Sequence, residues 1–370
     1  MKKVVKFGGS SLADAAQFQK VKKIIRAEKS RRYVVPSAPG KRHGADEKVT
    51  DLFYQYYDAT AAGQDGTLLR ARIQTRYREI IAGLGLQFSL EREFERIDEN
   101  FKGGCGRDYA ASRGEYLNGL IMAEYLGFPF VDAAEVVLFN ENGAFLPEET
   151  NEALRNHLSG METAVIPGFY GSMPDGTIRT FSRGGSDITG SLVARAVDAD
   201  LYENWTDVSG FLLADPRIVK DPLPISTITY SELHELSCMG ASVLHEDAVF
   251  PVKKAGIPIN IKNTNRPQDP GTMIVSRTSQ KPTCGITGIA GRKGGDSGLA
   301  MVAVGGRDRA ATPVLAGNVF SALKHAHIDV MAVDQRVETV TMVVGVRSRD
   351  FEVAVRAIYN QFLVQNTAVC

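Results

Sequence analysis

The stretch KKVVKF at residues 2–7, which runs directly into Gly8-Gly9-Ser10-Ser11, decides the fold of this 370-residue chain. The short apolar run predicts a strand, and the two glycines predict the turn that ends it. Residues 14–29 then have the apolar spacing of a helix, and a second apolar run, YVVPS at 33–37, ends at Ala38-Pro39-Gly40. A strand, a helix and a second strand in this order open a parallel α/β sheet.

The alternation of strands and helices is interrupted once. Residues 41–120 are charged and mostly free of proline, and we interpret them as a helical insertion across one end of the sheet. A helix entered from a glycine-rich turn is expected at 188–197. Further strands are expected at 128–131, 163–166, 177–181, 200–203, 257–262 and 271–275. The last of these closes a first domain, predicted to cover residues 1–276.

A compact second domain is predicted over residues 284–370, after the linker-like RTSQKPT at 277–283. Its elements are a strand, then a strand, a helix, two strands and a helix, which is a ferredoxin-like α+β order. The expected strands are 285–290, 299–304, 328–334 and 339–346, and the helices are 312–325 and 350–363. GGDSG at 294–298 reads as a flexible connection.

Composition excludes several classes of function. The 43 basic and 43 acidic residues give a formal net charge of zero, so no global positive field indicates nucleic acid. The sequence has no apolar stretch of membrane-spanning length and no signal-peptide core, and we therefore expect a cytoplasmic protein. The four cysteines lack metal-ligand spacing, and we expect them to be reduced thiols.

Lys6 and the glycines after it form the strongest local motif. Backbone N–H groups of Gly8, Gly9 and Ser10 can approach an anion closely, and a lysine at the strand end can bridge phosphates as a point charge. The spacing is neither that of a Walker A loop nor that of a dinucleotide-binding loop. The structural alternative is a plain turn with a surface lysine, and the motif alone does not decide between them.

A second motif, RGGSD, occupies residues 183–187. Arg183 offers a planar fork to a carboxylate, while Gly184, Gly185 and the helix start offer N–H groups to an anion. Asp187 is a negative charge beside that anion site, which is awkward unless a lysine or a magnesium ion is close. The alternative is a simple helix cap, but an arginine, two glycines and an acid within five residues favour a ligand site.

Other candidates are weak by themselves. WTDVSG at 205–210 and ADPR at 214–217 follow an expected strand, where α/β proteins bind ligands, but both also fit surface turns. Glu115 lies near the start of a helix in the insertion, a position that often only complements the helix dipole. The six histidines show no ligand spacing and no nucleophile partner, so no catalytic role is assigned to them.

Taken together, ordered motifs along most of the chain resemble the aspartokinase family, which has the amino-acid-kinase (carbamate-kinase-like) fold, a three-layer α/β sandwich. The motifs are KFGGSS at 6–11, SAPGKR at 37–42, KVTDL at 48–52, RGEYL at 113–117, PGFYG at 167–171, RGGSD at 183–187, WTDVSG at 205–210 and ADPR at 214–217. The segment 239–264 also resembles one branch of this family.

The resemblance implies ATP-dependent phosphorylation of the β-carboxylate of L-aspartate, with Mg²⁺, as the first step toward lysine, threonine and methionine. Lys6 is expected to act in catalysis, with Asp187 ordering it and the metal region. Lys6 is also expected to cradle the ATP phosphates, together with Gly8, Gly9 and Ser10. Ser37, Thr50, Glu115, Arg183, Gly184 and Gly185 are expected to hold the amino acid, with Arg183 on its α-carboxylate and Glu115 on its ammonium group. Thr206, Asp207 and Arg217 are expected to line the nucleotide.

Two features depart from the family pattern. Many members carry a lysine where this chain has Ser242 and a tyrosine where it has Leu212. Members usually carry two ACT modules, whereas here CGITGIAGRK at 284–293 leads through GGDSG into LAMVAVGG at 299–306, as if one module were missing. The sequence does not show whether that shortening is natural or engineered. We expect one ACT-like fold, weakened feedback control by lysine or threonine, and a homodimer or higher oligomer formed through this domain.

Two other functions are weighed against this one. The first is a kinase of another small acid, glutamate or acetylglutamate, although an acetylated substrate has no ammonium group for Glu115. The second is a non-catalytic amino-acid sensor with a decayed kinase domain. The presence of Lys6, Arg183 and Asp187 disfavours decay, while Ser242 and Leu212 favour it weakly.

Overall fold

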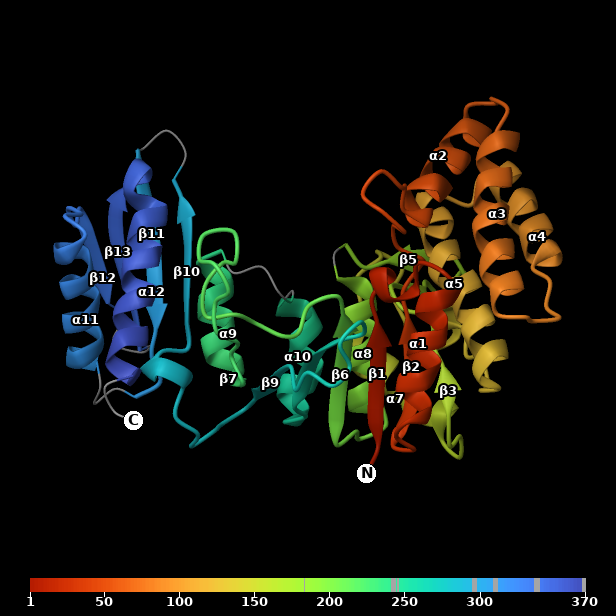
Figure 1. Ribbon diagram of the computed structural model, residues 1–370. Helices are drawn as coiled ribbons and strands as arrows, with labels where there is room; N and C mark the ends of the chain where they lie inside the picture. The colour runs from red at the N-terminus through yellow and green to blue at the C-terminus, as the bar shows by residue number, and fades with distance from the viewer. Residues whose placement is uncertain are drawn as a thin grey trace. The chain divides into compact units, whose positions relative to one another are not determined.

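The computed structural model of the chain describes residues 1–182, 184–240, 244, 246–294, 298–308, 312–335 and 340–367. These residues form two compact units (Figure 1). The first contains residues 1–208 and 245–269, and the second contains residues 209–244 and 270–370. The units do not follow the order of the chain, because residues 209–244 cluster with the C-terminal residues rather than with the first unit. The predicted domain limits, 1–276 and 284–370, stay a prediction.

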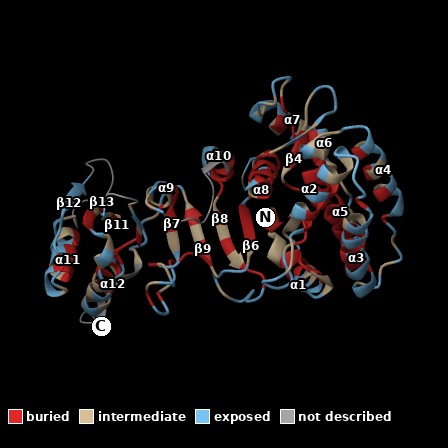
Figure 2. Cartoon of the chain, turned by 90° about the horizontal axis from the view of Figure 1, so that it is seen from above, coloured by how far each residue is buried: buried red, intermediate tan, exposed pale blue. Residues whose placement is uncertain are grey.

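Five parallel strands form the sheet of the first unit, in the order β3-β2-β1-β6-β8. Their bounds are β1 (Lys3–Phe7), β2 (Arg31–Pro36), β3 (Ala164–Val165), β6 (Leu201–Thr206) and β8 (Ile259–Asn263). β1 is buried along its whole length, as expected for a parallel strand with both faces covered. Helices α1 (Ala15–Arg26) and α8 (Gly185–Ala196) lie on opposite sides of this sheet (Figure 2). The three-layer sandwich expected from the sequence is thereby confirmed.

The helical insertion is also present, with somewhat different limits. Residues 41–48 form no helix, and the last inserted helix runs to Leu126 rather than ending near 120. The inserted helices are α2 (Val49–Ala61), α3 (Thr67–Gly83), α4 (Glu91–Lys102) and α5 (Arg107–Leu126). α5 is buried on nearly all sides, so its sequence shows no apolar stripe that could mark where it ends.

Of the three strands expected between the insertion and α8, the one at 128–131 was wrong. Residues 128–131 make only one isolated bridge, from Phe130 to Val165, instead of a strand. The run expected at 177–181 is a strand, β5, but it pairs with β4 in a separate hairpin outside the main sheet. Elements here or later in this unit that the sequence did not predict are α6 (Ala133–Val136), α7 (Pro147–Leu158) and α10 (Glu246–Ala255), and the hairpin strands are β4 (Tyr170–Ser172) and β5 (Ile178–Thr180).

The second unit contains a parallel strand pair and an antiparallel sheet. The pair is β7 (Thr227–Thr229) with β9 (Thr272–Val275), and α9 (Tyr230–Cys238) follows β7. The antiparallel sheet has the order β10-β11-β13-β12. Its elements are β10 (Gly288–Lys293), β11 (Leu299–Gly305), α11 (Thr312–His325), β12 (Ala332–Gln335), β13 (Thr341–Arg347) and α12 (Phe351–Thr367). β10 pairs at the edge, as predicted, so the ACT-like fold is complete; of the connection 294–298, residues 295–297 lie outside the described residues.

Candidate active site

Lys6 and Asp187 form an ion pair at the carboxyl edge of the first unit's sheet. Lys6, on β1, is 8% exposed, and its Nζ lies 2.6 Å from Oδ1 of Asp187, in the first turn of α8. Asn204 on β6 donates from Nδ2 to the same oxygen at 2.8 Å. Lys6 and Asn204 are register partners of adjacent strands, so the sheet itself sets this arrangement. The result is a buried cation held beside the start of a helix.

The glycines after Lys6 form a tight turn into a short 3-10 helix, Gly9–Leu12. The amide of Gly8 donates to the carbonyl of Trp205 at 2.9 Å, and a Cβ on Gly8 would lie 3.5 Å from Nζ of Lys6. Gly40 packs its backbone on this turn: its amide donates to the Gly9 carbonyl at 2.8 Å, and a Cβ on Gly40 would lie 2.5 Å from the Gly9 carbonyl carbon. Only glycine fits at position 40, a constraint that the sequence analysis missed.

Glu115 is buried on α5, with 7% of its surface exposed. Burial raises the pKa of its carboxyl to about 8, although a backbone hydrogen bond from Ala38 and the charges of Arg113 and Lys6 lower it. Its Oε2 atom has no hydrogen-bond partner. A buried acceptor without a donor is costly, so this oxygen is suited to a cationic ligand.

The segment after β2 lies against the same helix. Asn118, one turn beyond Glu115 and fully buried, donates from Nδ2 to the Ser37 carbonyl at 2.6 Å. A Cβ on Gly114 would lie 2.8 Å from the Ala38 Cβ and 3.7 Å from the Thr50 hydroxyl. Ser37, Thr50 and Glu115, which are far apart in the sequence, therefore meet around α5. Asn118 was missed as well, and its spacing of three residues from Glu115 is the signal that could have found it.

The start of α8 is built from two glycines whose positions exclude other residues. Gly184 adopts φ +59°, a left-handed conformation that favours glycine, and precedes the first helical residue. A Cβ on Gly185 would lie 2.5 Å from the Phe169 ring, so this position also excludes a side chain. The amide of Asp187 donates to the Gly184 carbonyl at 2.8 Å. Arg183 lies outside the described residues.

The residues expected at the nucleotide are divided between the two units. Thr206 ends β6, and its hydroxyl donates to the Asp207 carboxylate at 3.2 Å. Asp207 is exposed. Arg217 belongs to the second unit, where its exposed side chain pairs with Asp215 at 2.6 Å. Leu212 is 38% exposed, and Ser242 lies outside the described residues.

Asp187 is the carboxylate at this edge that could contact a magnesium ion. The described residues contain no cluster of three or more His, Cys, Asp or Glu side chains that could hold a metal alone. Asp187, whose side chain is 20% exposed, offers a carboxylate next to Lys6. Protein-bound Mg²⁺ commonly uses one or two carboxylates together with phosphate oxygens and water. The donor set therefore fits a magnesium ion that arrives with a nucleotide.

Comparisons with known proteins identify the family of the chain. The amino acid kinase family matches residues 1–263, and an ACT domain matches residues 302–362. Aspartokinase 3 of Bacillus subtilis is 39% identical over 307 residues, covering 78% of this chain and 67% of that protein.

Two further relatives extend the comparison. The solved structure of Clostridium acetobutylicum aspartate kinase is 42% identical, with a TM-score of 0.90, covering 97% of this chain and 100% of that one. The bifunctional aspartokinase/homoserine dehydrogenase 1 of Zea mays is 26% identical over 97% of this chain, which spans only 41% of that protein. The chain belongs to the amino acid kinase family and, within it, to the aspartokinases.

Proposed function

We propose that this aspartokinase transfers the γ-phosphoryl group of ATP to the β-carboxylate of L-aspartate at the carboxyl edge of β1, β2 and β6. The product is 4-phospho-L-aspartate, the first intermediate toward lysine, threonine and methionine. The observation that carries the proposal is the buried Lys6 ammonium group, fixed 2.6 Å from Asp187 beside the Gly8-Gly9 turn. A cation and backbone donors at one point suit a polyphosphate.

Each part of the substrates has a matching group. Lys6 and the amides of Gly8, Gly9 and Ser10 receive the phosphates. The unpartnered Glu115 oxygen receives the ammonium group of aspartate, and Arg183 receives its α-carboxylate. The remaining contacts are assigned to Ser37, Thr50, Gly184 and Gly185 for the amino acid, and to Thr206, Asp207 and Arg217 for the nucleotide.

The chemistry needs no general base. The attacking β-carboxylate of aspartate is ionised at neutral pH, so no proton has to leave the nucleophile. Catalysis is then positioning of the two substrates and neutralisation of charge on the transferred group. Lys6 and the glycine amides supply fixed positive charge and donors. Asp187 keeps the Lys6 side chain in place. Bound Mg²⁺ supplies further neutralisation of the phosphates, with Asp187 as the carboxylate that would hold it.

The test is hydroxamate formation from ATP, Mg²⁺ and L-aspartate, with L-glutamate and N-acetylglutamate in parallel and Lys6→Ala as control. We expect turnover with aspartate only, lost in the control. Turnover with glutamate or acetylglutamate instead would replace the substrate assignment. Absence of turnover with all three would favour a non-catalytic amino-acid sensor.

Glu115 makes aspartate binding dependent on pH. Since the pKa of its carboxyl is raised to about 8, the empty site holds it protonated at neutral pH, whereas the substrate ammonium group favours the ionised form. Binding therefore releases a proton, and affinity for aspartate should rise between pH 6 and 8, by at most about tenfold per pH unit. Aspartate KM measured across this range checks the sign. In Glu115→Gln the KM should be raised and independent of pH; a wild-type KM that does not fall toward pH 8 contradicts the assignment.

The C-terminal module is proposed to pair with that of a second chain, giving a homodimer or higher oligomer. With one ACT-like fold per chain, half of the pairing surface of a two-module relative is missing, and feedback inhibition is expected to be weak. Millimolar lysine or threonine added to the hydroxamate assay tests this, since strong inhibition would contradict it.

No described helix is long and apolar enough to cross a membrane. We place the enzyme in the cytoplasm, where thiols such as those of Cys105 and Cys238 stay reduced.

A further inference from the structure

We infer that Arg76, on α3 of the helical insertion, is a positioning residue that holds the phosphate loop, Gly8–Ser10, in its binding conformation. The inference rests on the proposed function, because it takes this loop as the phosphate site. Arg76 is assigned no contact with substrate. Its effect is exerted through the two backbone segments that lie next to the loop.

Arg76 is an arginine on a charged helix, yet only 4% of it is exposed. Its Nη2 donates to the Gly40 carbonyl at 2.9 Å and to the Ala13 carbonyl at 3.2 Å. Its Nη1 lies 2.7 Å from Oδ2 of Asp46. Ala13 closes the 3-10 helix that begins at Gly9, and Gly40 donates its amide to the Gly9 carbonyl. One guanidinium group therefore ties the segment after the phosphate loop to the segment packed on it.

Arg76 is the buried member of a row on α3. Arg72, Arg76 and Glu79, at spacings of four and three residues, lie on one face of the helix. They pair with Glu47, Asp46 and Arg42 respectively, all in the irregular segment 41–48. This segment connects Gly40 to Thr50 and so links the phosphate side of the site to its amino-acid side.

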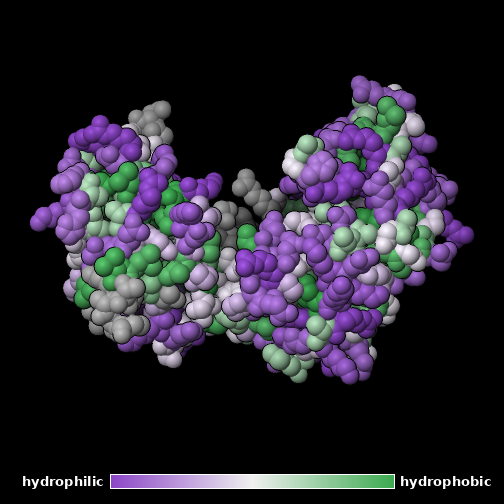
Figure 3. Space-filling model, viewed as in Figure 1, coloured by the Kyte–Doolittle hydropathy of each residue, from purple (hydrophilic) through white to green (hydrophobic). Residues whose placement is uncertain are grey.

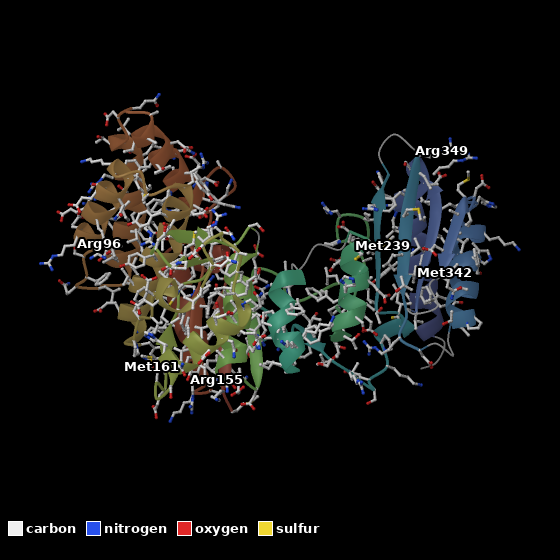
Figure 4. All side chains as sticks on the ribbon, turned by 180° about the vertical axis from the view of Figure 1, so that it is seen from behind. Arg96, Arg155, Met161, Met239, Met342 and Arg349 are labelled. Carbon is white, nitrogen blue, oxygen red and sulfur yellow. The ribbon has the colours of Figure 1, made fainter. Side chains whose placement is uncertain are left out.

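The outer members of the row are solvated. The side chains of Arg72 and Glu79 are 53% and 58% exposed, and exposed pairs contribute little stability. Hydrophilic residues cover much of this inserted region in Figure 3, and Arg96 on α4 extends away from it in Figure 4. Arg76 differs from these in facing inward onto backbone carbonyls.

A guanidinium group is needed because three acceptors surround it. Its planar fork can serve two carbonyls and a carboxylate at once, which a lysine ammonium on its flexible chain does poorly. Without it, the carbonyls of Gly40 and Ala13 lose a shared donor and the phosphate loop loses its support. A shift of about 1 Å in a positioning group can reduce the rate by about 100-fold.

The test compares Arg76→Met with Arg72→Met, the same substitution one turn earlier on the same helix. For Arg76→Met we expect kcat/KM for ATP to fall by roughly 10- to 100-fold, with a smaller change in aspartate KM. Arg72→Met should stay within about twofold of the wild type, as for an exposed ion pair. Melting temperatures show that each variant is folded during the assay. If Arg76→Met is not folded, Arg76→Lys, whose ammonium group can reach only Asp46, replaces it, and kcat/KM for ATP is again expected to fall.

Chemical rescue separates positioning from general damage. In Arg76→Ala, millimolar methylguanidinium should restore part of the lost kcat, while an equal concentration of ammonium should not. Calorimetric titration with MgADP, which needs no turnover, should show weaker binding to Arg76→Met than to wild type. Unchanged MgADP affinity and ATP kinetics in a folded Arg76→Met protein overturn the inference. Absence of aspartate turnover in the wild type contradicts the proposed function instead and leaves the MgADP comparison valid.

Discussion

Lys6→Met is expected to lower kcat by roughly a thousandfold, as the loss of a fixed charge on a transferring phosphoryl group does elsewhere. The methionine keeps the methylene packing of a side chain that is 8% exposed, so the change removes mainly the charge. It also leaves Asp187 without its cation and next to the incoming phosphates. The measurement is single-turnover phosphoryl transfer at saturating ATP and aspartate, which separates the chemical step from binding.

A matched control is available on the first helix. Lys22, on α1, donates to the Tyr125 carbonyl at 2.8 Å and lies over the Tyr125 ring, away from the glycine turn. Lys22→Met should keep kcat within about twofold, since it removes a peripheral contact. Retention of more than a tenth of the activity by Lys6→Met would mean that Lys6 is structural and that the phosphates are neutralised by other groups.

The local structure of the glycine motifs could be predicted from the sequence, because each is set by its own few residues. The turn after β1 follows from Gly8 and Gly9, and the start of α8 follows from Gly184 and Gly185. A strand directly before a glycine turn, or a glycine turn directly before a helix, can be recognised from its own residues without knowledge of the rest of the fold. The edge strand β10 was predicted for the same reason, from a short apolar run between two flexible segments.

The contacts that complete the site could not be predicted, because they join segments far apart in the chain. Position 40 must be glycine because the backbone of Gly9 packs against it. In the sequence Arg76 is one of many charged residues of its helix, and only the fold brings it to the carbonyls of Gly40 and Ala13. The strand expected at 128–131 failed for a related reason. Only Val131 of this run is buried, and the run meets β3 through the single bridge from Phe130 to Val165, so its apolar composition does not reflect a paired strand.

Glu203→Ala is expected to lower the free energy of unfolding of the first unit by about 3–5 kcal/mol, the usual cost of breaking a buried ion pair. Glu203, on β6, is 2% exposed, and its carboxylate lies 3.1 Å from Nζ of Lys3 and 2.8 Å from Nε of Arg31. It also accepts a hydrogen bond from Nε1 of Trp205 at 2.9 Å. Removing it leaves two buried cations and an indole N–H poorly paired.

Glu28→Ala is the matched control for this change. Glu28 pairs with the same Lys3 and Arg31, but its side chain is 37% exposed, so its loss should cost no more than about 1 kcal/mol. The single tryptophan of the chain, Trp205, reports urea unfolding of this unit by fluorescence.

Side chains alternate along a strand, so Lys3 and Glu203 lie on the opposite face of the sheet from Lys6 and Asn204. Folded Glu203→Ala should therefore keep near wild-type kcat. A Glu203→Ala midpoint no lower than that of Glu28→Ala would show that solvent reaches the cluster and that the stability of this sheet rests on its apolar core alone.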